Sequence, residues 1–277
     1  MICENNILIT GGSGYVGQAT YSLIPKAINA DIRDVSFPID LLSYENLYRY
    51  IDKNDIRYVL HLAAFKNIKE SISNPTKYYH NNLLSSLNLF KVCEKLNLPM
   101  VFASSASVYY DSNPYSLSKI LFENILKESS INYLILRYFN IGGLIQSPSN
   151  YQKDNVFDVI RNCLKLNELF YLNKNTFPRD YSHVLDVAEI NVKALEMVAF
   201  KECRNTYDVC SGVNTSLKTI LNLYSQKNIK INFIENNSLC ENYKEVQLNR
   251  FPYFNKHNVL DIVESEIYHG IDKNLLL

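Results

Sequence analysis

Three residues, Ser105, Tyr115 and Lys119, have the types and the spacing of a site that transfers hydride. Tyr115 and Lys119 are four residues apart in a segment typical of a helix, so they share one face. A tyrosine with a reference pKa near 10 is a base at neutral pH only if its phenolate is stabilised, and a shift of about 3 units requires about 4 kcal/mol. A lysine ammonium and an oxidised nicotinamide both supply the positive charge that this requires.

The position of these three residues among the predicted strands and helices is stronger evidence for a catalytic site than their spacing. The chain holds 21 tyrosines, so a tyrosine four residues before a lysine also arises by chance, and Ser105 alone would suit a turn. However, Ser105 follows a predicted strand at 99–103, and Asn113 and Pro114 are typical of a helix start just before Tyr115. A helix start also favours negative charge on the phenolate. Hydride transfer is therefore the favoured chemistry.

A glycine-rich turn near the N-terminus indicates a second site. Four of the eight glycines in the chain, Gly11, Gly12, Gly14 and Gly17, fall within seven residues, between an apolar run and a helical segment. Glycine permits unusual backbone angles and lets backbone N–H groups approach a pyrophosphate at a helix N-terminus. This pattern predicts a dinucleotide site. No Gly-Lys-Ser/Thr follows, which excludes a P-loop.

An acidic residue should end the second strand and bind the adenosine ribose. Asp31 and Asp34 are the two candidates, and we favour Asp31 because residues 27–30 can form a short strand before it. An acid there disfavours a 2′-phosphate and favours NAD, although Arg33 keeps NADP as an alternative. Asp40 follows a third short predicted strand, where an acid can approach the adenine.

The elements that must position these groups alternate along the chain. We predict strands at 6–10, 57–63, 99–103 and 132–138, and helices at 15–24, 75–96 and 114–127. Such alternation indicates βαβ units and a parallel sheet. The predicted fold class is therefore α/β, a doubly wound (Rossmann) parallel sheet that binds ligands at the carboxyl ends of its strands.

The regular alternation fades after Gly143. We predict helices at 156–166 and 186–200 and strands at 170–172 and 206–210. The expected organisation is an NAD-binding domain at 1–143 and a smaller C-terminal substrate-binding cap at 144–277. Elements around 184–210 are expected to return to the first domain.

Composition limits the possible functions. Of the 277 residues 47% are hydrophobic and 20% charged, which excludes a disordered chain. Lys plus Arg and Asp plus Glu are both 28, so nothing favours a nucleic-acid partner. No apolar run approaches the ~18 residues of a membrane span. The six cysteines form no CxxC pair and have no histidine at ligand spacing, so we expect no metal site and a cytoplasmic location.

Eight short runs make the chain resemble the extended short-chain dehydrogenase/reductase family, and within it the NAD-dependent sugar-nucleotide epimerases of the UDP-hexose 4-epimerase type. The runs include TGGSGYVG at 10–17, PTKYYHNN at 75–82 and PYSLSK at 114–119, and the others lie at 61–66, 70–71, 102–109, 137–140 and 179–184. They occur in the family's order over residues 6 to about 200.

This resemblance implies roles for individual residues. Tyr115 is the base, Lys119 orients it and binds the nicotinamide ribose, and Ser105 is the hydroxyl partner. Sugar-nucleotide contacts are implied for Asn140 and Asn155, and a diphosphate contact for Arg179. Cofactor contacts are implied for Gly11, Gly14, Tyr15, Val16, Gly17, Asp31, Asp40, Leu41, Leu62, Ala63, Ala64, Lys66, Asn81, Tyr115, Lys119, Tyr138 and Phe139. Without the resemblance, Lys66 would suit a solvated face, Arg179 with Asp180 a surface ion pair, and His61 a core position.

The implied activity is epimerisation at C4 of a UDP-hexose by transient oxidation to a 4-keto sugar, with NAD retained. A 4-keto reductase that consumes NADH or NADPH is the alternative, and a non-catalytic NAD(P)-binding regulatory protein is the alternative from another class. The Ser105 stretch lacks the Asp-Glu pair of sugar-nucleotide 4,6-dehydratases, which disfavours that reaction. Residues 106–114 are shorter than in the family, and Arg250 is only a weak candidate for a second phosphate-binding arginine. The expected partner is a nucleotide sugar, and a homodimer is possible.

Overall fold

The computed structural model describes residues 2–32, 39–110, 112–144, 155–173, 177–236, 246–253 and 255–270. Contacts within the chain divide it into two compact units. Unit 1 comprises Met1–Tyr138 and Ala188–Asp208, and unit 2 comprises Phe139–Val187 and Val209–Leu277. Within the described ranges, no helix has both the length and the apolar character needed to cross a membrane.

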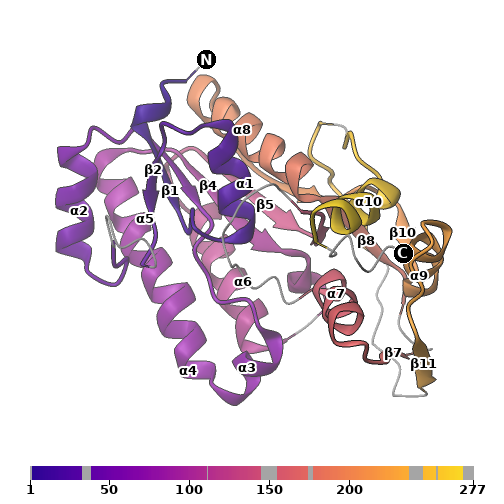
Figure 1. Ribbon diagram of the computed structural model, residues 1–277. Helices are drawn as coiled ribbons and strands as arrows, with labels where there is room; N and C mark the ends of the chain where they lie inside the picture. The colour runs from indigo at the N-terminus through magenta and orange to yellow at the C-terminus, as the bar shows by residue number, and fades with distance from the viewer. Residues whose placement is uncertain are drawn as a thin grey trace. The chain divides into compact units, whose positions relative to one another are not determined.

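A six-stranded sheet forms the centre of unit 1 (Figure 1), in the order β2-β1-β3-β4-β5-β9. The pairs that join β2 through β5 are all parallel, which confirms the predicted fold class. The order changes direction between β1 and β3, and ligands of doubly wound sheets bind at such a switch point. The strands are β1 (Ile7–Thr10), β2 (Ile28–Ala30), β3 (Tyr58–His61), β4 (Met100–Ser105), β5 (Tyr133–Tyr138) and β9 (Arg204–Val209).

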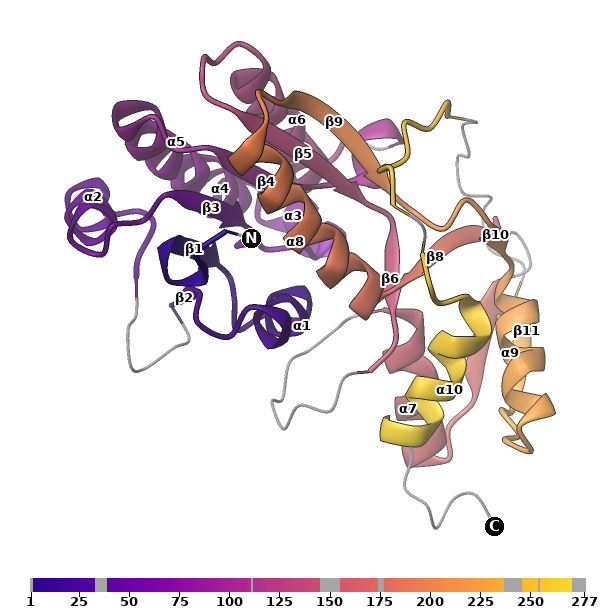
Figure 2. The ribbon, with the colours of Figure 1, turned by 90° about the horizontal axis from the view of Figure 1, so that it is seen from above.

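Helices cover both faces of this sheet, with α1 and α8 on one face and α2, α5 and α6 on the other (Figure 2). The second face contains a core cluster built from alternate strand residues, such as Leu8, Val59 and Phe102, and from apolar helix positions, such as Leu47 and Phe122. The helices are α1 (Tyr15–Leu23), α2 (Tyr44–Lys53), α3 (Ile68–Ser73), α4 (Pro75–Tyr78), the π-helical segment η2 (Tyr79–Leu84), α5 (Ser85–Leu96), α6 (Pro114–Lys127) and α8 (Val184–Phe200), with short 3₁₀ turns η1 (Glu4–Asn6) and η3 (Ala106–Tyr109).

The described part of unit 2 contains two small sheets and three helices. The strands β10 (Asn214–Thr215), β8 (Arg179–His183) and β6 (Asn140–Gly142) form one sheet in that order, and β11 (Phe233–Asn236) pairs in parallel with β7 (Phe170–Asn173). The helices are α7 (Val156–Leu166), α9 (Leu217–Gln226) and α10 (Val259–Gly270). They enclose a separate apolar cluster that includes Phe157, Tyr181, Tyr224 and Ile262.

Candidate active site

The glycine turn follows β1 and leads directly into α1. Gly11 has φ +71, and a Cβ there would lie 2.8 Å from the backbone of Ala63. A Cβ on Gly17 would lie 2.3 Å from the carbonyl oxygen of Gly11. Gly14, the N-cap of α1, provides no side-chain cap. Tyr15, Val16 and Gly17 form the first turn of α1, and the N–H groups at such a helix start fit a dinucleotide pyrophosphate.

The acid at the end of β2 supports this turn. Asp31 is buried, and its Oδ2 accepts a hydrogen bond from the backbone N–H of Ser13 at 3.1 Å. The other candidate, Asp34, lies outside the described residues. Asp40 is exposed, and its Oδ1 accepts from the N–H of Leu42 at 2.9 Å. The side chain of Leu41 is buried in the core cluster.

The loop after β3 is fixed by Asn82 of the π-helical segment. Its Oδ1 accepts from the N–H of Phe65 at 2.8 Å, and its Nδ2 donates to the carbonyl oxygen of Phe65 at 2.9 Å. Asn81 lies beside it and donates to Asn82 Oδ1 at 3.2 Å. Leu62, Ala63 and Ala64 are half-buried here, whereas Lys66 is exposed. Asn82 was not predicted as a site residue, although the Asn81–Asn82 pair within a matching run is the signal that points to it.

His61 is buried at the end of β3 and forms part of a hydrogen-bonded chain. The hydroxyl of Ser86 donates to the carbonyl oxygen of Asn82, so it accepts from Nε2 of His61 at 2.7 Å. Nδ1 is then the acceptor for the hydroxyl of Thr10 at 2.6 Å. Burial lowers the pKa of His61 to about 3, and the charge of Lys119 acts in the same direction. His61 is thus a neutral core residue, as the sequence indicated.

The predicted catalytic trio comes together at the carboxyl end of β4 and the first turns of α6. Asn113 caps α6 by accepting from the N–H of Ser116 at 3.0 Å, and Pro114 follows as the first helical residue. This places Tyr115 in the first turn. Burial raises the pKa of Tyr115, and a hydrogen bond with Ser105 opposes that rise.

Lys119 extends from α6 under the end of β4. Its Nζ donates to the carbonyl oxygen of Ala103 at 2.8 Å and lies 4.7 Å from the ring centre of Phe102. The side chain is 5% exposed. Burial lowers the pKa of Lys119 to about 7, and the carboxylate of Glu123 opposes this shift.

Tyr138 lies opposite Ser105 in the β4–β5 register. Its hydroxyl donates to Oδ1 of Asn191 in α8 at 2.6 Å, and Asn191 donates to Thr20 of α1 at 3.0 Å. These contacts fix the end of β5 against the helices on one face of the sheet. The next residue, Phe139, begins unit 2, where its N–H donates to the carbonyl oxygen of Val209 at 3.2 Å.

The three predicted sugar-nucleotide residues all belong to unit 2. Asn140 in β6 donates to the carbonyl oxygen of Asp180 at 2.9 Å. Asn155 caps α7 in a capping box and donates to the carbonyl oxygen of Ile141 at 3.1 Å. Arg179 is exposed at the start of β8.

Asp180, next to Arg179, is buried rather than part of a surface ion pair. Its carboxylate accepts from the N–H groups of Ser211 and Gly212 at 2.7 and 2.6 Å. Arg250 donates to the carbonyl oxygen of Ser211 at 3.3 Å, so the second candidate arginine lies against the loop that Asp180 holds.

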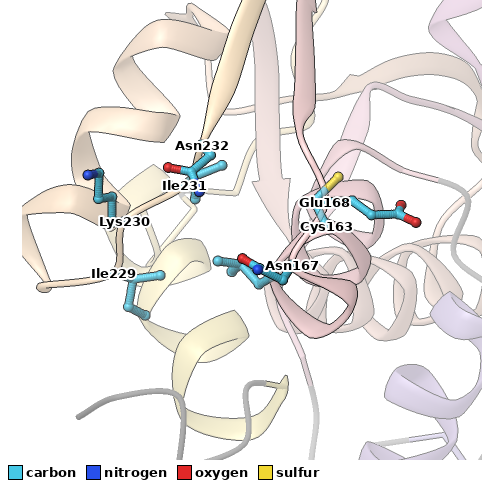
Figure 3. A pocket seen from close by; sticks show the side chains of 8 residues that line it. Cys163, Asn167, Glu168, Ile229, Lys230, Ile231 and Asn232 are labelled. Atoms are coloured by element: carbon cyan, nitrogen blue, oxygen red, sulfur yellow. The ribbon is translucent and has the colours of Figure 1, made fainter.

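A surface pocket in unit 2 contains none of the predicted site residues. Figure 3 shows Cys163 and residues 167–168, at the end of α7, facing residues 229–232. The candidate residues of unit 1 lie instead at strand ends and helix starts, and Asn140, Asn155 and Arg179 lie in other parts of unit 2.

The sheet order and the glycine turn define a dinucleotide-binding protein of the Rossmann class. The chain belongs to the NAD dependent epimerase/dehydratase family, whose model matches residues 7–210. UDP-glucose 4-epimerase of Yersinia enterocolitica is 30% identical, with 83% of this chain and 85% of that protein covered. UDP-glucose 4-epimerase uge1 of Schizosaccharomyces pombe is 29% identical, with 80% of each covered.

Solved structures show the same fold. UDP-glucose 4-epimerase from Brucella ovis in complex with NAD superposes with a TM-score of 0.84 at 19% identity and covers 97% of this chain and 99% of that chain. The enzyme from Bifidobacterium longum in complex with NAD⁺ and UDP gives a TM-score of 0.79 at 23% identity, with 94% and 96% covered.

Proposed function

We propose that this protein is an NAD-dependent epimerase that inverts C4 of a UDP-hexose. The observation that carries the proposal is the meeting of Ser105, Tyr115 and Lys119 at the end of β4, beside a sheet edge where the glycine turn fits NAD. The relatives of this chain that are named UDP-glucose 4-epimerases support the choice of substrate.

The glycine turn of Gly11, Gly14 and Gly17 would hold NAD, which would supply the hydride acceptor and donor for C4 of the sugar. Tyr115 would take the proton of the C4 hydroxyl and give it back, because its phenol lies in the first turn of α6 and is hydrogen-bonded with Ser105 at the end of β4. Burial raises the pKa of Tyr115, so positive charge must offset that rise before the phenolate can act. The ammonium of Lys119 supplies such charge, and the hydroxyl of Ser105 donates toward the same oxygen.

The remaining predicted residues divide between the units in this proposal. In unit 1 the turn residues Gly11, Gly14 and Gly17 contact the pyrophosphate, with Asp31 on the adenosine ribose. In unit 2 Asn140, Asn155 and Arg179 contact the sugar nucleotide. The proposal also includes the predicted division into an NAD-binding domain at 1–143 and a substrate-binding cap at 144–277.

A cytoplasmic homodimer completes the proposal. No cysteine in the described part of the chain forms a disulfide, which suits a reducing compartment. Large apolar side chains are exposed on helices of unit 1, and they offer surface for a second copy: Ile72 at 64%, Leu84 at 38% and Leu121 at 44%. Sedimentation of the purified protein would test the dimer, and a monomer at micromolar concentration would contradict it.

The decisive test is to incubate the purified protein with UDP-galactose, without added cofactor, and to look for UDP-glucose by chromatography. Conversion is expected, because the NAD is recycled. A requirement for added NADH or NADPH would indicate the keto reductase instead. NAD binding without conversion of any sugar nucleotide would indicate a non-catalytic protein. The Tyr115→Phe variant should keep NAD and lose at least about a hundredfold in kcat.

A further inference from the structure

Tyr115, Lys119 and Glu123 are spaced four residues apart on α6, so they follow one stripe of the helix. Tyr115 and Lys119 already have roles in the proposed reaction. Glu123 has none, yet it is 2% exposed, and a carboxylate is rarely buried so completely without a partner. The stripe therefore contains a third ionisable group, to which the proposed reaction gives no role.

The three side chains contact three consecutive residues at the end of β4. These three residues are Ala103, Ser104 and Ser105. The contacts are Tyr115 with the hydroxyl of Ser105, Lys119 Nζ with the carbonyl oxygen of Ala103 at 2.8 Å, and Glu123 Oε1 with Oγ of Ser104 at 2.6 Å. Glu123 thus extends the contact between α6 and β4 by one helical turn.

Glu123 remains a carboxylate in this position. Arg137 of β5 binds both its oxygens, with Nε at 2.9 Å from Oε1 and Nη2 at 2.5 Å from Oε2. Burial acts to raise the pKa of Glu123, but hydrogen bonds from Arg137 and Ser104 bring that pKa below its usual value. A negative charge is therefore present one turn beyond Lys119.

Lys119 needs that charge. Burial brings the pKa of Lys119 to about 7, so at neutral pH its ammonium is close to losing its proton, and Glu123 acts against the loss. A neutral lysine would withdraw the positive charge that Tyr115 requires as a base. The charge of Glu123 therefore influences Tyr115 indirectly, through the protonation of Lys119.

We propose that Glu123 is a positioning residue for the proposed epimerase reaction: its buried carboxylate keeps Lys119, one helical turn from Tyr115, in the ammonium form, and its bond to Ser104 holds the end of β4 against α6. The inference rests on the proposed function only for its catalytic consequence. The effect on Lys119 is a property of the protein alone.

Other charged and titratable groups surround the stripe. Arg137 also donates to the hydroxyl of Tyr109 at 2.7 Å, and Tyr109 donates to Oδ1 of Asp208 at 2.8 Å. Among the described residues these groups include Tyr78 of α4, His61 of β3, Tyr109 of η3, Lys127 of α6, Arg137 of β5 and Asp208 of β9. A substitution at Glu123 changes none of these residues themselves.

The first test measures the ionisation of Lys119 without substrate. Lysines labelled with ¹³C at Cε report the protonation of Nζ by NMR, and the Lys119 signal is the one that disappears in Lys119→Met. We expect its midpoint to move to lower pH in Glu123→Gln and to stay near the wild-type value in Glu123→Asp, which keeps the charge. Glu128→Gln is the matched control, because it removes the same charge from an exposed site at the end of α6. An unchanged midpoint in Glu123→Gln would overturn the proposal.

The second test measures turnover of UDP-galactose. We expect kcat of Glu123→Gln to fall about tenfold at neutral pH with KM within about twofold, and the alkaline limb of the pH–rate profile to move to lower pH. A purely structural role would lower the amount of active protein without moving that limb, and an unmoved limb would count against the proposal. If the wild type converts no UDP-galactose, the proposed function fails while the Lys119 titration still decides the role of Glu123.

Removal of Glu123 alone leaves the partly buried guanidinium of Arg137 without its carboxylate partner, and this single variant can fail to fold. The double variant Glu123→Gln/Arg137→Gln then takes its place, because it removes both charges of the pair. The Lys119 midpoint is expected at lower pH than in the wild type in this protein as well. A midpoint at the wild-type value would overturn the proposal here too.

Discussion

Ser107 donates two hydrogen bonds to the same atom of Ser105: its backbone N–H lies 3.2 Å and its hydroxyl 3.0 Å from Oγ. Because Ser105 Oγ accepts both, its own proton is free to point at Tyr115. Burial raises the pKa of Tyr115, and the hydrogen bond with Ser105 opposes that rise. The direction of the Ser105 hydroxyl is therefore set by the short turn η3 that follows β4.

Ser107→Ala should lower kcat while leaving binding unchanged. The variant keeps the backbone N–H and loses one neutral hydrogen bond, which is worth about 0.5–1.5 kcal/mol and corresponds to a loss of about twofold to tenfold. Steady-state kinetics with UDP-galactose would show kcat reduced and KM unchanged. Ser105→Ala should cost more, because it removes the hydroxyl itself. If kcat fell by the same factor in both variants, Ser107 would not act by orienting the hydroxyl of Ser105.

Alanine substitutions at Gly11 and Gly14 should have different effects, one on the stability of the fold and the other on NAD binding. Gly11 has φ +71 and a Cβ would lie 2.8 Å from the backbone of Ala63, so Gly11→Ala should destabilise the fold by about 1–3 kcal/mol. Gly14 has φ −79 and ψ 174, a conformation open to any residue, so Gly14→Ala should fold normally. Its added methyl group would instead obstruct the pyrophosphate.

Denaturant unfolding and NAD titration together separate the two effects. Gly11→Ala should show a lower free energy of unfolding, and Gly14→Ala should keep the wild-type value but bind NAD more weakly. If Gly14→Ala bound NAD as the wild type does, the pyrophosphate would not lie over the first turn of α1.

The main sheet of unit 1 was predictable because buried parallel strands are short apolar runs and each is followed by a helix. The predicted strand at 132–138 and helix at 114–127 correspond to β5 (Tyr133–Tyr138) and α6 (Pro114–Lys127). Helix α2 (Tyr44–Lys53) was not predicted, because only two of its residues, Leu47 and Ile51, are buried and the segment is otherwise polar. The small strands β6 and β10 have two or three residues, too few for a period to appear.

The site was predictable only in part, for a related reason. Tyr115 and Lys119 share a helix face, so their spacing in sequence is their spacing in space. The partners of Lys119 and Glu123 lie on β4 and β5, and the register that places Ser104 opposite Arg137 is a tertiary property. Asn82 likewise acts on Phe65, 17 residues away, through a π-helical turn that no local pattern indicated.

His61 should make the protein less stable in mild acid. Its folded pKa of about 3 lies below the ordinary value of 6.5, so the unfolded chain binds the proton more readily between those values. Stability is therefore complete above pH 6.5 and is lost as the pH falls toward 3, at up to about 1.4 kcal/mol per pH unit.

The variant His61→Gln keeps a polar side chain between Thr10 and Ser86 but cannot titrate. Its free energy of unfolding should be lower at pH 7 and should change less between pH 6.5 and 5 than that of the wild type. This window lies above the range in which Glu70 and Glu123, whose pKa values are lowered, take up protons. Urea titrations at several pH values would give the free energy of unfolding of both proteins. If it changed equally with pH in the two proteins, His61 would not be the neutral, buried histidine assigned here.

Arg179→Ala should weaken substrate binding without altering the chemical step. Arg179 is exposed at the start of β8, and the carboxylate of the buried Asp180 beside it accepts from the N–H groups of Ser211 and Gly212. A charge-assisted bond to a diphosphate is worth about 1.5–3 kcal/mol, which corresponds to an increase in KM of about tenfold to a hundredfold. UDP carries the diphosphate without the sugar, so its inhibition constant should rise by the same factor. The exposed Arg57, in unit 1, provides the control substitution Arg57→Ala, which should change neither constant. A raised KM with an unchanged inhibition constant for UDP would place Arg179 on the sugar rather than on the diphosphate.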